Sequence, residues 1–259
     1  MNLLHSTIIG DSGRDLLILH GFLGMGDNWK THAKGWAAMG YRVHLIDQRN
    51  HGRSFWSDKF SYKSMVEDLA HYCQVNEVKR PILLGHSMGG KTVMQYACTY
   101  PERVSTFIVA DIAPKAYTSH HQLILNGLAA LDFSQIKTRN QANEALSVYV
   151  KDENTRQFLL KNIYWETPEK LGLRININIL KNASEVIGEG LDANAQSSVP
   201  CLFLKGGNSE YILNQDHLII QHHFPNAEIK EIAAAGHWLH AEQPTIFFQQ
   251  VNAWLNSGV

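Results

Sequence analysis

The sequence has little of what marks secreted, membrane-spanning or nucleic-acid-binding proteins. Its 259 residues include three cysteines, Cys73, Cys98 and Cys201, whose wide spacing predicts neither a disulfide framework nor a metal site. No apolar run is long enough to cross a bilayer, and the first residues lack the basic and apolar segments of a signal peptide. A formal net charge of -1 gives no reason to expect nucleic acid or an anionic membrane as a partner. We therefore expect a cytoplasmic protein with buried, reduced thiols.

The composition is otherwise that of a globular enzyme, with 44% hydrophobic residues. Apolar runs alternate with helical patterns, and we predict strands at residues 16–19, 41–46, 82–84, 104–110, 200–205 and 228–234. Helices are predicted at residues 27–38, 60–73, 216–223 and 241–255, and another follows the third strand and ends at residue 100. This alternation predicts an α/β fold with a mostly parallel central sheet and helices on both faces.

Residues 114–199 interrupt this alternation. Helices are predicted there at residues 117–131, 140–150, 155–164 and 179–187, with a short strand at 173–179. Because the segment is far longer than an ordinary connection, we interpret it as a helical cap. The core then consists of residues 1–113 and 200–259. A cap over the carboxyl edge of the sheet would exclude water from a site there.

The most informative stretch is the G-x-S-x-G pentapeptide at residues 85–89, which stands between a predicted strand and a predicted helix. In that context the glycines allow a tight, strained turn, and the Ser87 hydroxyl is exposed above the sheet. Ser87 is therefore the candidate nucleophile. The oxyanion of its reaction needs preorganised donors, for which we predict the backbone amides of Met88 and Phe22.

A serine nucleophile needs a base, and His237 follows the last predicted strand at the same edge of the sheet. His240 is the rival, but it stands where a helix is expected to begin. His20 and His86 flank loops and are predicted to make structural hydrogen bonds. The pairs at residues 120–121 and 222–223 are predicted to be solvated.

The acid that orients the base has several candidates. In α/β proteins of this kind it precedes the histidine and follows the nucleophile in the chain. The loop at residues 206–211 has Ser209 where an aspartate is expected, with Glu210 beside it. Asp111 closes an earlier neighbouring strand and is the favoured acid, alone or together with Ser209. Glu210 and Asp216 remain alternatives.

These motifs together resemble the α/β-hydrolase superfamily, and more narrowly the YbfF-type bacterial esterases. The resemblance rests on RNHG at residues 49–52, GHSMGGK at 85–91, DIAP at 111–114, GGNS-x-Y at 206–211 and GHWxHAExP at 236–244. It implies Ser87 as nucleophile, His237 as base and Asp111 as acid. It also implies Ser209 as a fourth member, a helical lid and no cofactor.

The expected activity is hydrolysis of a small-molecule carboxylic ester or acyl thioester. Hydrolysis of a C–C bond or a lactone, or perhydrolysis, would use the same three side chains. A non-catalytic binding protein of this fold would carry a damaged triad, whereas this triad is intact in the sequence. A dehalogenase or an epoxide hydrolase is disfavoured because Ser87 stands where those enzymes place an aspartate. Both a monomer and a dimer are compatible with the sequence.

Overall fold

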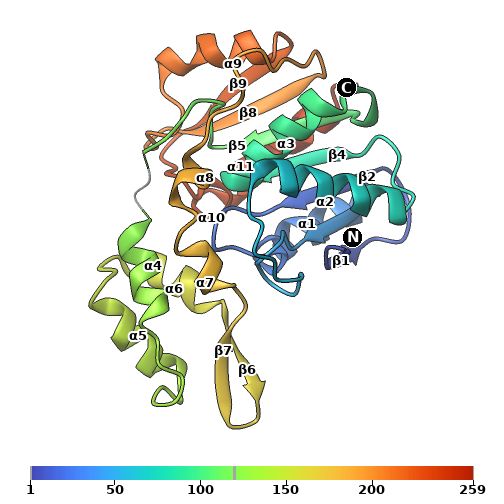
Figure 1. The fold of residues 1–259 in the computed structure, drawn as a ribbon. Coiled ribbons are helices and arrows are strands. Elements are labelled where there is room, and N and C mark those ends of the chain that lie inside the picture. Colours follow the sequence, from blue (N-terminus) through green and yellow to red (C-terminus); the bar gives the residue numbers. More distant parts are fainter. Residues whose placement is uncertain (1, 119–120, 259) are drawn as a thin grey trace.

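The computed structural model describes residues 2–118 and 121–258 and has two parts (Figure 1). One is a central sheet covered by helices, and the other is a group of helices with a small hairpin, formed by the middle of the chain. Figure 1 shows this second group below the sheet, beside the ends of its strands. Within the described residues, no helix is long and apolar enough to cross a membrane.

The central sheet has seven strands in the order β1-β3-β2-β4-β5-β8-β9. Only β1 runs antiparallel to its neighbour, and the other pairs are parallel, which confirms the predicted mostly parallel sheet. The strands are β1 (Ser6–Ile9), β2 (Asp15–Leu19), β3 (Arg42–Ile46), β4 (Ile82–His86), β5 (Thr106–Ala110), β8 (Cys201–Gly206) and β9 (Ala227–Ile232). Strand β1 was not predicted, because this short edge strand is only half-buried and has no buried apolar run.

Helices cover both faces of the sheet. They are α1 (Lys30–Ala38), α2 (Tyr62–Val75), α3 (Met88–Thr99), α9 (His217–His223), α10 (Leu239–Glu242) and α11 (Pro244–Leu255), with 3-10 turns η1 (Gly26–Trp29), η2 (Pro101–Arg103) and η3 (Asn214–Asp216). Leu17 and Leu19 of β2 pack with α2 and α3, whereas Leu16 and Ile18 pack with α1 and α11. This alternation follows from the two-residue period of a strand, and it places apolar cores on both sides of the sheet.

The segment between β5 and β8 is mostly helical, but its details differ from the prediction. It contains α4 (Gln122–Ala129), α5 (Arg139–Ser147), α6 (Glu153–Leu160), β6 (Ile163–Thr167), β7 (Lys170–Leu173), α7 (Ile177–Leu180) and α8 (Ser184–Gly188). The strand predicted at residues 173–179 is wrong, because those residues end β7 and begin α7. The helix predicted at 155–164 ends at Leu160, and the one predicted at 179–187 is two short helices. Part of the helix predicted at 117–131 lies outside the described residues.

The β6–β7 hairpin explains most of this difference. Most of β6 is exposed, and Trp165 is 58% accessible, so the strand carries no alternating buried pattern. The inserted segment nevertheless has an apolar core of its own, which includes Leu125, Leu146 and Leu180. This core also takes in Phe22 and Met88, from the loop after β2 and the start of α3. The insertion therefore packs against the carboxyl edge of the sheet.

The two ends of the insertion lie side by side. The Leu191 amide donates to the Pro114 carbonyl at 2.8 Å, and the Tyr117 amide donates to the Gly188 carbonyl at 2.8 Å. A chain that leaves and re-enters the core at one place can be shortened there without stretching the core.

We predict that residues 1–113 and 200–259 form a core that folds without the cap. Deletion of residues 118–189 joins Tyr117 to Gly190, and Gly190 lies against Ala116, the residue directly before Tyr117. The variant is expected to unfold in one cooperative transition in urea, because the two core faces of the sheet are left intact. Loss of that transition, measured by circular dichroism against the full chain, would contradict a separable cap.

Candidate active site

Ser87 stands at a strained turn between β4 and α3. Its φ of 52° and ψ of -114° lie in a region that residues with a side chain rarely occupy. A Cβ atom on Gly85 would lie 2.2 Å from the Gly89 carbonyl oxygen, and one on Gly89 would lie 2.2 Å from the Leu19 carbonyl oxygen. The glycines of the pentapeptide are thus needed for close backbone approach, as predicted. Strain of this kind costs on the order of 1–3 kcal/mol and is held by the surrounding sheet.

Asp111 is the hub of the polar contacts at this edge. Its side chain is fully buried directly after β5, and it accepts hydrogen bonds from three groups. Oδ1 accepts from the Gly206 amide at 2.9 Å. Oδ2 accepts from Nδ1 of His237 at 2.8 Å and from the Ser209 hydroxyl. The structure therefore brings Asp111, Ser209 and His237 together.

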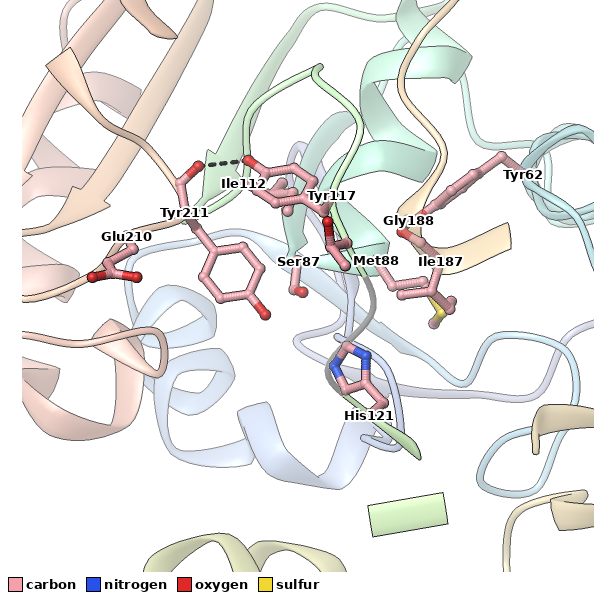
Figure 2. Close-up of a pocket in the computed structure, with 11 residues that line it drawn as sticks. Tyr62, Ser87, Met88, Ile112, Tyr117, His121, Ile187, Gly188, Glu210 and Tyr211 are labelled. Carbon is pink, nitrogen blue, oxygen red and sulfur yellow. Dashed lines mark hydrogen bonds between the residues drawn. The ribbon is translucent and has the colours of Figure 1, made fainter. Parts of the chain in front are cut away.

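The alternative acids and the rival base have other surroundings. Asp216 accepts from Nζ of Lys115 at 2.6 Å and from the Leu213 amide at 2.8 Å, so its carboxylate is already engaged. The Glu210 carboxylate points away from Ser87 (Figure 2). The His240 ring is buried and stacks on Trp29 with 4.1 Å between ring centroids.

His237 and Ser87 line the same cavity, which has a volume of about 270 Å³. No hydrogen bond joins the two side chains in the described part of the chain, and the Nε2 atom of His237 makes none to a described residue. Catalytic hydrogen bonds are often long before substrate binds and shorten in the reacting complex. The ring itself is held on its other sides. Tyr211 stacks on it at 3.8 Å between centroids, and Nε2 of His86 donates to the His237 carbonyl at 2.8 Å.

The amides of Phe22 and Met88 are buried at the same place. Neither donates to an acceptor within residues 2–118 or 121–258, although the two residues are only 8% and 1% exposed. A Cβ atom on Gly21 would lie 3.3 Å from Cβ of Ser87, so the loop that carries Phe22 lies against the turn. Buried amides are rarely left without an acceptor, and such a pair is suited to hold an oxygen that develops negative charge.

Two buried histidines hold this loop. Nδ1 of His20 donates to the Gly21 carbonyl at 2.8 Å, and Nε2 accepts from the Gln48 amide at 2.9 Å. Nε2 of His51 accepts from the Leu23 amide at 3.2 Å. The structural role predicted for His20 and His86 is thereby confirmed. Sequence reasoning missed His51, which only the folded loops bring to this place.

The prediction for the paired histidines is wrong in part. His222 is exposed, but His223 is buried, and its Nδ1 donates to the Ala195 carbonyl at 2.6 Å. His121 is half-buried and lines the cavity next to Ser87, while His120 lies outside the described residues. The sequence around His121 carries no signal for this position, because it depends on how the insertion packs.

A second cavity of about 170 Å³ also reaches Ser87 (Figure 2). Its wall includes Tyr62 and Ile112 of the core and Tyr117 and Ile187 of the insertion, so the core and both ends of the insertion contribute to it. Tyr211, His121 and Ser87 line both cavities. No group of three or more potential metal ligands is found among the described residues.

Comparisons with known proteins show the family and the fold of the chain. The family described as the alpha/beta hydrolase fold matches residues 16–138. Esterase YbfF of Escherichia coli is 32% identical over 93% of this chain and 92% of its own. The sn-1-specific diacylglycerol lipase ABHD11 of Danio rerio is 36% identical over 95% of this chain and 79% of its own. The solved structure of a marine microorganism esterase is 41% identical, has a TM-score of 0.94 and covers 98% of this chain and 99% of its own.

The histidines around the site are kept neutral by burial. Burial lowers the pKa of His20 to about 4 and those of His51 and His240 to about 3, and proximity to other histidines adds to the effect for His51 and His240. The pKa of His86 is also well below its ordinary value, mainly because of burial. At neutral pH the walls of the site therefore carry no imidazolium charge from these rings.

These pKa values predict a loss of stability in acid. Each histidine with a lowered pKa binds a proton below about pH 6.5 in the unfolded chain but not in the folded chain. The free energy of unfolding therefore falls as the pH drops below about 6.5. Between pH 7 and pH 5 each of His20, His51 and His240 should lower that free energy by about 2 kcal/mol. Together they account for about 6 kcal/mol, a large part of the stability of a typical domain.

Urea unfolding at pH 7 and pH 5 measures this loss. His240→Phe should reduce it by about 2 kcal/mol, because phenylalanine keeps a ring against Trp29 and does not titrate. The exposed His222→Gln is the matched control and should leave the loss unchanged. Equal stability of the wild-type protein at the two pH values would contradict neutral buried histidines.

Proposed function

The chain belongs to the α/β-hydrolase family and is of the esterase/lipase type, and from this premise we propose that it cleaves carboxylic esters through an acyl-enzyme on Ser87. His237 acts as general base and then as general acid, and Asp111 orients it. The observation that carries the proposal is the hydrogen bond between the buried Asp111 carboxylate and Nδ1 of His237. The His237 ring and Ser87 line the same cavity.

The reaction follows from these contacts. Because Asp111 accepts the Nδ1 proton, Nε2 of His237 carries the lone pair that receives the Ser87 proton. The Ser87 oxygen attacks the ester carbonyl, and the amides of Phe22 and Met88 donate to the resulting oxyanion. His237 then protonates the departing alcohol, and water releases the acyl group by the same steps in reverse. Ser209 donates to Asp111 and is proposed to hold the carboxylate in place.

The two cavities suggest how the substrate is divided. The leaving alcohol must reach His237. Of the two cavities at Ser87, His237 lines the one of about 270 Å³ and not the one of about 170 Å³. The acyl group is then left to the smaller cavity of about 170 Å³. An apolar cavity of about 150 Å³ holds one benzene molecule, so the smaller cavity is suited to an acyl chain of about six carbons. The proposed substrates are therefore esters of short acyl chains, and the same steps would open an acyl thioester.

Ser87 is expected to be the site of covalent labelling. A fluorophosphonate should add one phosphonyl group to the intact protein, because the probe mimics the ester carbonyl and traps the activated serine. Ser87→Ala should abolish the adduct. The matched control is Ser198→Ala. Ser198 is exposed and its carbonyl accepts from Asn226, so this variant should be labelled like the wild type. An adduct that survives Ser87→Ala, by intact mass, would refute the nucleophile.

The identity of the acid is tested by a pair of amide substitutions. Asp111→Asn would present an amide group to Nδ1 and favour the tautomer with its proton on Nε2, which cannot accept the Ser87 proton. We therefore expect kcat to fall by about a thousandfold or more. Glu210→Gln should change kcat by less than about twofold, because that carboxylate points away from Ser87. Kinetics on p-nitrophenyl butyrate give both values. The opposite ranking would move the acid to Glu210.

A further inference from the structure

A lysine lies buried behind the smaller cavity. Lys91 stands on α3, four residues after Ser87, and is 1% exposed. No carboxylate forms an ion pair with it in the described part of the chain. Its ammonium group donates instead to the carbonyl of Lys115 at 3.0 Å, to that of Gly188 at 3.3 Å and to that of Glu189. An ammonium group has three donors, and all three are used here by backbone carbonyls.

These carbonyls belong to the two chain segments that connect the core with the cap. We call residues 114–117 the first stem and residues 188–191 the second stem. Direct hydrogen bonds already join the stems, from Leu191 to Pro114 and from Tyr117 to Gly188. Lys91 binds both stems at once and fastens them to α3, the helix that begins directly after Ser87.

Burying a cation that has no direct ion pair is costly, and an apolar side chain could fill the same space without that cost. The faces of Tyr117 and Tyr62, at 4.8 and 5.9 Å from Nζ, offset part of it. What an apolar side chain could not do is bind three carbonyls. The hydrogen bonds from the ammonium group to the stem carbonyls therefore explain why a charged residue stands here.

The same stems form a wall of the smaller cavity. Tyr117 of the first stem and Gly188 of the second both line it, together with Ile187 and Tyr62 (Figure 2). The hydroxyl of Tyr62 also donates to the Ile187 carbonyl at 3.1 Å. Any outward movement of the stems would lengthen this cavity.

We propose that the stems, clamped together by Lys91, set the longest acyl chain that the enzyme accepts. Lys91 is then a positioning residue that acts through the cavity wall, because its ammonium group binds the stems and makes no hydrogen bond to Ser87. The proposal rests on the proposed function, since it takes the smaller cavity as the acyl site. Loosening the clamp should relax the length limit and leave the chemistry of Ser87 in place.

The experiment compares kcat/KM for p-nitrophenyl octanoate and p-nitrophenyl acetate. Lys91→Met fills the same space without holding the carbonyls, and it should raise the octanoate-to-acetate ratio about tenfold, mainly through a lower KM for octanoate. Because the ratio is taken on one preparation, a variant that is only partly folded does not change it. The matched control is Lys170→Met on the exposed hairpin, which should keep the wild-type ratio.

Gly190→Ala separates the stems without altering Lys91. A Cβ atom at residue 190 would lie 2.9 Å from the amide nitrogen of Ala116 and 3.1 Å from the carbonyl carbon of Lys115, so the stems must move apart. It should raise the ratio in the same direction. If Lys91→Met gives no folded protein, the ratio of Gly190→Ala decides alone.

Failure of this proposal and failure of the proposed function look different. Variants that are labelled by fluorophosphonate at Ser87 and keep the wild-type ratio would overturn the clamp. A wild-type protein without labelling at Ser87 would overturn the proposed function itself. A raised ratio in both variants, with labelling intact, supports the clamp.

Discussion

The buried carboxylate of Asp111 is the contact on which the rest of the site depends. It lies directly after β5, where the register of β5 with β8 pairs Ala110 with Leu204 and brings the Gly206 amide to Oδ1 at 2.9 Å. A fully buried carboxylate is tolerated only when donors surround it, and Gly206, Ser209 and His237 supply them. The parallel sheet thus determines where the acid stands, and the acid determines how the imidazole is turned.

Three histidines near this contact are buried and uncharged at neutral pH. His20, His51 and His240 are buried and have pKa values of about 3 to 4, so they contribute fixed dipoles instead of charges at neutral pH. His20 and His51 hold the loop of Phe22 through backbone amides and carbonyls. Preorganised donors of this kind need not reorganise when charge develops on a substrate. The cost of the arrangement is sensitivity to acid.

The features that the sequence predicts are those with a local cause. The glycines around Ser87 predict a tight turn, and β-branched and leucine-rich runs predict buried strands. Asp111 is a candidate because the loop at residues 206–211 has Ser209 where an acid is expected. The β6–β7 hairpin is missed because most of β6 faces solvent and the strand carries no alternating pattern. His51, Tyr211 and Lys91 gain their places only from contacts between distant segments, which no spacing in the sequence records.

The most direct test of the central claim is a crystal structure of the protein after reaction with a fluorophosphonate. The account predicts phosphorus bonded to the Ser87 oxygen, with the phosphonyl oxygen about 2.7–3.1 Å from the amide nitrogens of Phe22 and Met88. Nδ1 of His237 should remain bonded to Asp111, with Nε2 turned to the serine oxygen. A phosphonyl oxygen that contacts neither amide, or an imidazole bonded to a different carboxylate, would contradict the account.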